Sequence, residues 1–229
     1  MKPRKVAIFD IDGTIFRSSL LIEVTEALIQ EGIFPARARK TYAAEYKKWL
    51  DRKGNYDDYI RGVINSFDRF IKGVQYKTFL GIAQKVVNFH KNRVYRFTRD
   101  LTKKLRKQGY FLLAISKSPK AIVEKFCQEL GFHKVYGLYY ETDQRERFTG
   151  KIPFFDLMSD KAKILRRAMK KENLILKGSV GVGDSESDIR FLRLVEKPIC
   201  FNPNSVLYKH GKRHGWRVVV ERKDVIYNL

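Results

Sequence analysis

The chain has 229 residues, 44% of them hydrophobic, and a formal net charge of +22. This length and hydrophobic content predict a globular protein, either one large domain or a core with a smaller insert. No stretch approaches the roughly 18 uninterrupted apolar residues of a membrane-spanning helix, and the opening MKPRKVAIFD reaches Asp10 before a signal-peptide apolar region could form. We therefore expect a cytoplasmic protein.

The cysteines indicate the redox compartment of the protein, and the positive charge indicates its possible partners. Cys127 and Cys200 lie in apolar patterns and are expected to be buried thiols of a reduced compartment. The segment Arg37–Lys53 holds seven basic residues against two acidic ones. It is either a solvated helix face or a surface that attracts polyanions. Nucleic acid is thus a conceivable partner, but no zinc spacing, helix-turn-helix signature or aromatic RNA-binding motif supports it.

The first predicted element is a short buried strand over Lys5–Phe9, because its apolar run leaves no polar face for solvent. The strand ends at Asp10, and Asp12, Gly13 and Thr14 follow. A two-residue step in extended chain points both carboxylates in a similar direction, so a cation, a shared proton or a turn must offset their repulsion.

The pattern then becomes helical. Apolar faces recur at helical spacing, and glycine or proline separates them; the four faces are Leu21–Ile29, Tyr42–Leu50, Tyr59–Ile71 and Phe79–Phe89.

From about Tyr95 onward, strands alternate with amphipathic helices. The predicted strands are Tyr110–Ser116, Lys134–Tyr140, Ser179–Asp184, Lys197–Phe201 and Trp216–Val220. This alternation favours an α/β fold, a Rossmann-like three-layer core in which helices cover both faces of a parallel sheet. The first strand joins that sheet, so residues 17–93 are predicted to be a helical cap domain inserted into a core of residues 1–16 and 94–229.

Polar side chains stand at the ends of predicted strands, and one stands at the start of a helix between two of them. Ser116 ends LLAIS, Asp184 ends VGVGD with Asp188 in the turn beyond, and Lys161 follows Ser159 and Asp160, either of which can cap a helix. Each pattern alone is weak, since acidic pairs are commonly helix caps. A cation in the first turn opposes the helix dipole, however, which indicates a partner anion.

Taken in order, DIDGT, ISKSP, the Lys161 helix start and GDSESD resemble the four motifs of the haloacid dehalogenase superfamily, in its phosphoserine-phosphatase-like branch. The segment CFNPNSVLYKHGKRHGW resembles that branch's last strand, Asn-Pro pair and final helix. The likeness covers nearly all of the predicted core, and the helical insert stands where that branch has its cap domain.

The resemblance implies a Mg²⁺-dependent phosphomonoester hydrolase that acts on a small phosphorylated metabolite through an aspartyl-phosphate. Asp10 would be the nucleophile and Asp12 the general acid and base. Mg²⁺ would bind the Asp10 side chain, the Asp12 backbone carbonyl and Asp184, with Asp188 supporting the metal end from behind.

The resemblance also implies a set of phosphate-binding residues. Ser116 and Lys161 would hold the phosphoryl oxygens, with Lys161 neutralising charge during transfer, and Thr14 would support the first loop.

Serine specificity does not carry over. Phosphoserine phosphatases usually have Glu nine residues after the nucleophile, where this chain has Ser19, and the nearest acid is Glu23. We expect phosphoserine to be a poor substrate and multiply anionic esters to be favoured. Three functions stay open: a small-molecule phosphatase, with phosphoserine as an alternative substrate; a phosphatase or binding protein for nucleic acid or another polyanion; and a non-catalytic phosphate-binding module. The substrate and the oligomeric state are not predicted.

Overall fold

A seven-stranded sheet forms the centre of the protein, whose computed structural model describes residues 3–229. The strand order is β3-β2-β1-β4-β5-β6-β7, with every neighbouring pair parallel except β6 and β7. The strands are β1 (Arg4–Phe9), β2 (Phe111–Pro119), β3 (Lys134–Leu138), β4 (Leu174–Gly183), β5 (Lys197–Phe201), β6 (Arg217–Arg222) and β7 (Val225–Asn228). The predicted α/β fold is confirmed, and the antiparallel strand β7 is an addition that the sequence did not predict.

The strand β1 lies at the middle of this sheet. Val6 to Phe9 are completely buried, and Ala7 pairs with Leu112 of β2 on one side and Val180 of β4 on the other. Parallel strands end at the same edge of a sheet, so the carboxyl ends of β1, β2 and β4 bring their following residues together.

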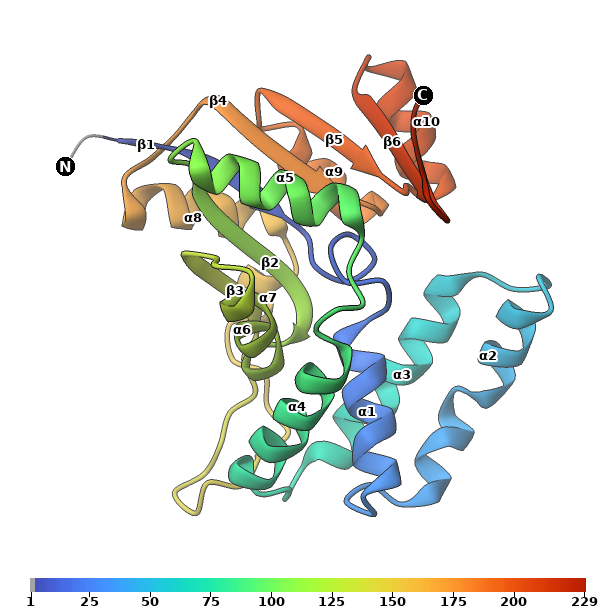
Figure 1. The fold of residues 1–229 in the computed structure, drawn as a ribbon. Helices are drawn as coiled ribbons and strands as arrows, with labels where there is room; N and C mark the ends of the chain where they lie inside the picture. The colour runs from blue at the N-terminus through green and yellow to red at the C-terminus, as the bar shows by residue number, and fades with distance from the viewer. Residues whose placement is uncertain (1–2) are drawn as a thin grey trace.

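Helices cover both faces of the sheet (Figure 1). Alternate β1 residues belong to two separate hydrophobic clusters: Ala7 and Phe9 lie on the side of α5 and α6, and Val6 and Ile8 on the side of α8, α9 and α10. The five helices are α5 (Arg96–Lys107), α6 (Lys120–Glu129), α8 (Lys161–Glu172), α9 (Ile189–Leu192) and α10 (Ser205–Arg213). The period-two alternation of a strand therefore produces the three layers.

A cap domain of helices lies beside the carboxyl ends of the strands (Figure 1). It contains α1 (Leu20–Gln30), the 3₁₀ helix η1 (Ala36–Thr41), α2 (Ala43–Leu50), α3 (Tyr56–Ile71) and α4 (Tyr76–His90). Its two connecting peptides run side by side, since Arg17 N donates to Arg93 O at 3.0 Å and Phe16 bridges Val94. The limits at residues 17 and 93 remain a prediction.

A hairpin from the core, here called the arm (residues 139–151), reaches along the cap, and the sequence did not predict it. Its backbone pairs with the turn between α3 and α4: Gly73 N donates to Phe148 O (2.8 Å), and Tyr76 N donates to Glu146 O (2.8 Å). The buried Phe148 ring meets Phe79 of α4 edge-on at 5.4 Å. The cap is thus attached to the core by contacts as well as by its two peptides.

Two composition-based expectations can be compared with these elements. Cys127 and Cys200 are both free and buried, as predicted. Across residues 3–229, none of the helices combines the length and the apolar character that crossing a bilayer demands. A short helix, α7 (Phe155–Met158), leads from the arm toward α8.

Candidate active site

A buried lysine connects two of the predicted catalytic carboxylates. Lys161 is the first residue of α8, whose start Asp160 caps by accepting from the backbone N–H of Ala162 and Lys163. Its ammonium lies 2.8 Å from Asp10 Oδ1 and 2.5 Å from Asp188 Oδ1, and the residue is only 3% exposed. The sequence indicated an anionic partner for the cation at this helix start. Asp10 and Asp188 are such partners.

The turn after β4 supplies the remaining acids. Asp188 Oδ2 accepts from the backbone N–H of Asp184 and Ser185, at 3.0 and 3.1 Å, so the turn is folded around that carboxylate. Oxygens of Asp10, Asp184 and Asp188 all lie within 4.8 Å of one another. Asp10, directly after β1, and the two acids after β4, at least 174 residues further along the chain, therefore meet at one edge of the sheet.

This cluster holds more negative than positive charge. Burial raises the pKa of Asp10 to about 6; Lys161 opposes that shift, while Asp188 and Asp12 add to it. Burial, reinforced by Asp10 and Asp188, also raises the pKa of Asp184 well above its usual range. Three close carboxylates face one ammonium, and carboxylate oxygens are the ligands that Mg²⁺ prefers. The residues present therefore fit a divalent cation.

Gly13 allows the first loop to approach that cluster. Its φ is +77°, in the left-handed region, and a Cβ added there would stand 2.2 Å from Asp184 Oδ2. Both the backbone conformation and the lack of space demand glycine. Thr14, also buried, places its hydroxyl 3.5 Å from Asp10 Oδ2, and its carbonyl accepts from the Thr98 hydroxyl of α5 at 2.9 Å.

The Asp12 side chain is held by a set of donors. Its Oδ1 accepts from Leu20 N at 2.6 Å, and its Oδ2 accepts from the hydroxyls of Ser116 (2.6 Å) and Ser118 (2.9 Å). Burial raises the pKa of Asp12, and these hydrogen bonds oppose the shift. Two carboxylates that are two residues apart thus occupy different surroundings.

Ser118 was missed by the sequence analysis. The sequence placed Ser116 at the site for phosphate binding, and its hydroxyl is here shared between Asp12 and Ser118 N, which donates to it at 2.9 Å. Residues two apart in a strand lie on one face, so the ISKSP spacing contains the signal that Ser118 accompanies Ser116.

The cap contributes Tyr56 and Asp57, at the start of α3, to the surroundings of the site. Tyr56 is 40% exposed, but partial loss of solvent around its hydroxyl raises its pKa, and the carboxylates of Asp12 and Asp184 raise it further. Burial likewise raises the pKa of Asp57, followed by the effect of Glu186 in the turn after β4. Both side chains are therefore within electrostatic range of the core's acidic turn. No short motif marks them, because the fold of the cap brings them there.

Glu23, the acid nearest to the position of the missing specificity residue, already has partners. One of its oxygens lies 2.8 Å from Arg93 Nη1 and the other 3.1 Å from His90 Nε2. It joins α1 to the end of α4, and Ser19 is buried directly before α1.

Comparisons with known proteins agree with this arrangement. The family model of the haloacid dehalogenase-like hydrolases matches residues 7–193. A histidinol-phosphatase from Neisseria meningitidis serogroup C (strain 8013) is 25% identical over 94% of this chain and 98% of its own. A phosphoserine phosphatase from Archaeoglobus fulgidus is 21% identical over 90% of this chain and 55% of its own.

A solved structure supports the fold independently. A phosphoserine phosphatase, studied as an analogue of its phospho-aspartyl intermediate, superimposes with a TM-score of 0.62 at 21% identity and covers 97% of this chain and 96% of its own. The family match spans both the first loop and the acidic turn of the site. The chain therefore belongs to the haloacid dehalogenase-like hydrolases, as an enzyme of their phosphatase type.

Proposed function

We propose that the protein is a Mg²⁺-dependent phosphomonoester hydrolase that acts on a small phosphorylated metabolite through an aspartyl-phosphate on Asp10. The observation that carries this proposal is the meeting of Asp10, Asp184, Asp188 and Lys161 in one buried cluster, with Asp12 held separately by hydroxyl and backbone donors. A nucleophile and an acid in different environments are what this two-step reaction needs.

In the first step, an Asp10 oxygen attacks phosphorus and the ester P–O bond breaks. A proton from the Asp12 carboxyl passes to the leaving alkoxide, which departs as the alcohol. In the second step, Asp12 takes a proton from water as the water oxygen attacks the acyl phosphate. Inorganic phosphate leaves, and the Asp10 carboxylate is restored.

Other residues bind and orient the phosphoryl group. Lys161 offers positive charge beside Asp10, and Ser116 offers a hydroxyl next to Asp12. Mg²⁺, held by the Asp10 and Asp184 side chains and the Asp12 carbonyl, would supply further neutralisation of the phosphoryl oxygens. Asp188 forms an ion pair with Lys161 and accepts a hydrogen bond from the backbone of Asp184, so it holds both of these residues in position.

We propose an amine-bearing phosphomonoester as the preferred substrate, with histidinol phosphate, named by one relative, as the first candidate. The cap residues in range of the site include an aromatic ring and an acid, Tyr56 and Asp57; besides burial, Glu186 raises the pKa of Asp57, while the cations Arg61 and Lys117 lower it. A cationic group is favoured beside such side chains. In the basic run Arg37–Lys53, Arg39 pairs with Glu26 and Lys48 with Glu45. The preference for multiply anionic esters stays a prediction, which a sugar bisphosphate tests.

The test is phosphate release from histidinol phosphate, phosphoserine and a sugar bisphosphate, each with Mg²⁺. We expect kcat/KM to be highest for histidinol phosphate and Asp10→Asn to lower it at least about 10³-fold with the fold unchanged, because an amide is a very poor nucleophile. Substantial turnover by pure Asp10→Asn would refute the mechanism. The bisphosphate as best substrate would refute the substrate class and leave the mechanism standing.

A further inference from the structure

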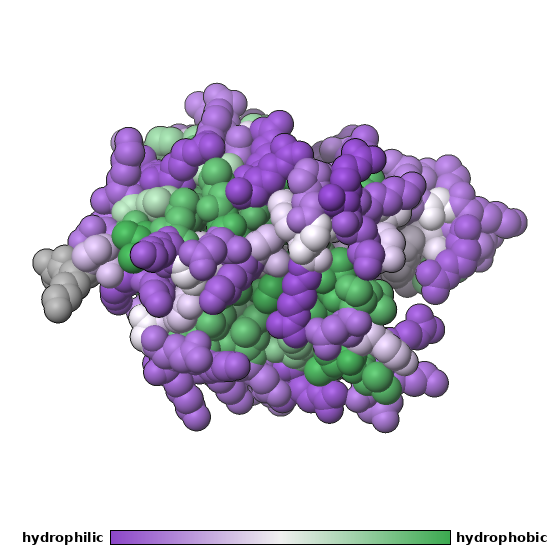
Figure 2. Space-filling model, turned by 90° about the horizontal axis from the view of Figure 1, so that it is seen from above, coloured by the Kyte–Doolittle hydropathy of each residue, from purple (hydrophilic) through white to green (hydrophobic). Residues whose placement is uncertain are grey.

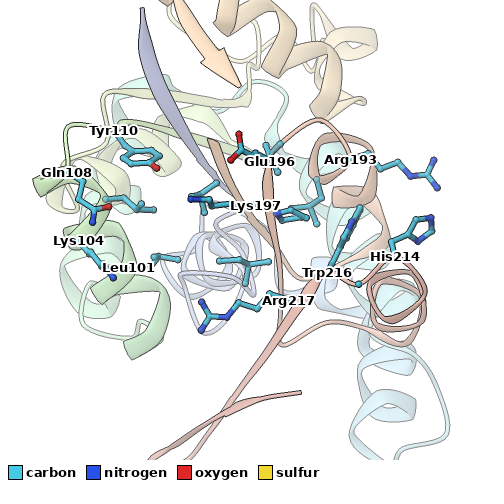
Figure 3. A pocket seen from close by; sticks show the side chains of 17 residues that line it. Leu101, Lys104, Gln108, Tyr110, Arg193, Glu196, Lys197, His214, Trp216 and Arg217 are labelled. Carbon is cyan, nitrogen blue, oxygen red and sulfur yellow. The ribbon is translucent and has the colours of Figure 1, made fainter. Parts of the chain in front are cut away.

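A groove of about 1040 Å³ lies on the core at the end of the sheet opposite to the catalytic carboxylates. It is lined by α5, by Lys197 and Arg217, the first residues of β5 and β6, and by Trp216 just before β6 (Figure 3). Asp10 and Asp184, by contrast, follow the last residues of their strands. Because the strands are parallel, the groove is a separate place on the molecule, with no part in the proposed hydrolysis.

The polar rim of this groove is cationic. The side chains of Lys104, Lys197 and Arg217 come from three elements and extend toward the same hollow (Figure 3). In the part of the chain that the structure describes, neither lysine is in an ion pair. Arg217 donates through Nε (3.2 Å) and Nη2 (2.7 Å) to the neutral Asn228 amide oxygen, and its guanidinium lies 5.3 Å from the centre of the Phe97 ring. Glu196 is the acidic residue of the lining, and its carboxylate accepts from Gly178 N. The groove therefore has uncompensated positive charge.

The lining between the cations is apolar and aromatic. Leu101, Val180 and Ile199 contribute aliphatic side chains, and Trp216 is half-buried with the His214 ring 5.9 Å away. A view onto this end of the molecule shows hydrophobic patches between hydrophilic side chains (Figure 2). The indole packs against the core and the rings of His210 and His214 but stays partly exposed in this basic groove, where it can receive an unstacked nucleobase.

The walls extend the positive charge on both sides of the groove. The helix α5 carries six basic residues and one acid, Asp100, which is paired with Arg99. On the other side the lining includes Arg193, which follows α9 and whose Nε donates to His210 Nε2 at 3.4 Å. A single small anion needs only the central cations, whereas charge along both walls suits a chain of phosphates.

We propose that this groove binds single-stranded nucleic acid, with backbone phosphates on Lys104, Lys197 and Arg217 and a base stacked on Trp216. The chain has a net charge of +22, and these groove residues are basic residues of the core, separate from the basic run of the cap. Binding there does not require hydrolysis, and the proposal stands or falls independently of the substrate.

The experiment uses Trp216 as its own reporter. The chain has two tryptophans, so Trp49→Phe leaves Trp216 alone. We expect a twelve-nucleotide oligo(U) to quench its fluorescence saturably at low salt and to bind much more tightly than uridine monophosphate. Binding that leaves Trp216 fluorescence unchanged, no binding at low salt, or equal affinity for the mononucleotide would each overturn the proposal.

Matched charge variants locate the contact. The groove variant Lys104→Gln/Lys197→Gln/Arg217→Gln and the cap variant Lys40→Gln/Lys47→Gln/Lys77→Gln remove the same charge from exposed positions. The groove variant should bind oligo(U) at least about tenfold more weakly and reduce the slope of log Kd against log salt by about 2, since each phosphate contact on a single strand contributes roughly 0.7. The cap variant should change Kd less than about twofold. Both should hydrolyse phosphate esters at the wild-type rate, and equal weakening by the two variants would refute the site.

Discussion

Asp12 is the residue whose surroundings define its chemistry most sharply. Three donors, Leu20 N and the hydroxyls of Ser116 and Ser118, surround its carboxylate. In Asp12→Asn the amide oxygen can still accept from Leu20 N while the serine hydroxyls turn to accept from the amide NH₂, so the fold should persist. The variant cannot protonate a leaving group. We expect kcat/KM to fall about 10²- to 10⁴-fold for alkyl phosphates and much less for aryl phosphates, which leave readily. Greater loss with the aryl esters would exclude Asp12 as the general acid.

Gly13 is the second residue with a sharp expectation. In Gly13→Ala the new Cβ must displace the Asp184 carboxylate, 2.2 Å away. We expect at least about tenfold lower activity and a higher Mg²⁺ requirement, measured as the Mg²⁺ concentration for half-maximal rate. Gly109→Ala is the matched control, because Gly109 has a similar φ of +79° but open space around it. It should lose stability through backbone strain alone. Equal activity loss in both variants would mean that the contact with Asp184 is unimportant.

At the scale of elements, the arm makes a measurable contribution to stability. Phe148→Ala removes a buried ring that contacts Phe79, Tyr76 and Tyr140 edge-on. We expect unfolding to become easier by about 3 kcal/mol, with faster amide exchange in α4 and the α3–α4 turn. Phe89→Ala in α4 removes an identical side chain that is 84% exposed. It should change the free energy of unfolding by less than about 0.5 kcal/mol. Slow exchange in the cap of Phe148→Ala would show that the arm is not what steadies it.

The sequence predicted the elements that short-range patterns encode. β5 appears with its predicted limits, and the cap helices lie where the apolar faces repeat, because burial on one side sets a period that neighbouring residues reveal. The arm and β7 were not predicted. Nothing in the neighbouring sequence distinguishes Tyr140 and Phe148 from other aromatic residues. Their contacts with Phe67 and Phe79 of the cap, which are distant in sequence, hold the arm in place. The proximity of Tyr56 to the acidic turn likewise depends on how the cap lies on the core.

At the scale of the whole molecule, the cluster of carboxylates stores repulsion that a divalent cation relieves. Asp10, Asp184 and Asp188 are brought together by folding and are apart in the unfolded chain. Binding to the native state alone raises stability by mass action. We expect Mg²⁺ to raise the Tm of the wild-type protein and chelator to lower it again. Asp184→Ala should lose most of that Mg²⁺-dependent increase along with its activity. An equal rise in Tm for wild-type and Asp184→Ala would place the stabilising metal elsewhere.

Among the contacts between cap and core, which include Leu20 N with Asp12 at the start of α1, two attachments lie at opposite ends of α4 and bear on how the cap can move. One is the pair of connecting peptides at Arg17 and Arg93, next to the end of α4, and the other is the arm, paired with the chain at Gly73 and Tyr76, where α4 begins. A rigid body fixed near two points can rotate only about the line through them, and here that line follows α4. Such a rotation displaces the distant helix α2 and the start of α3 the most, so Tyr56 and Asp57 would swing across the catalytic carboxylates while α4 turned in place. A substrate would then enter from the α2 side, opposite the arm.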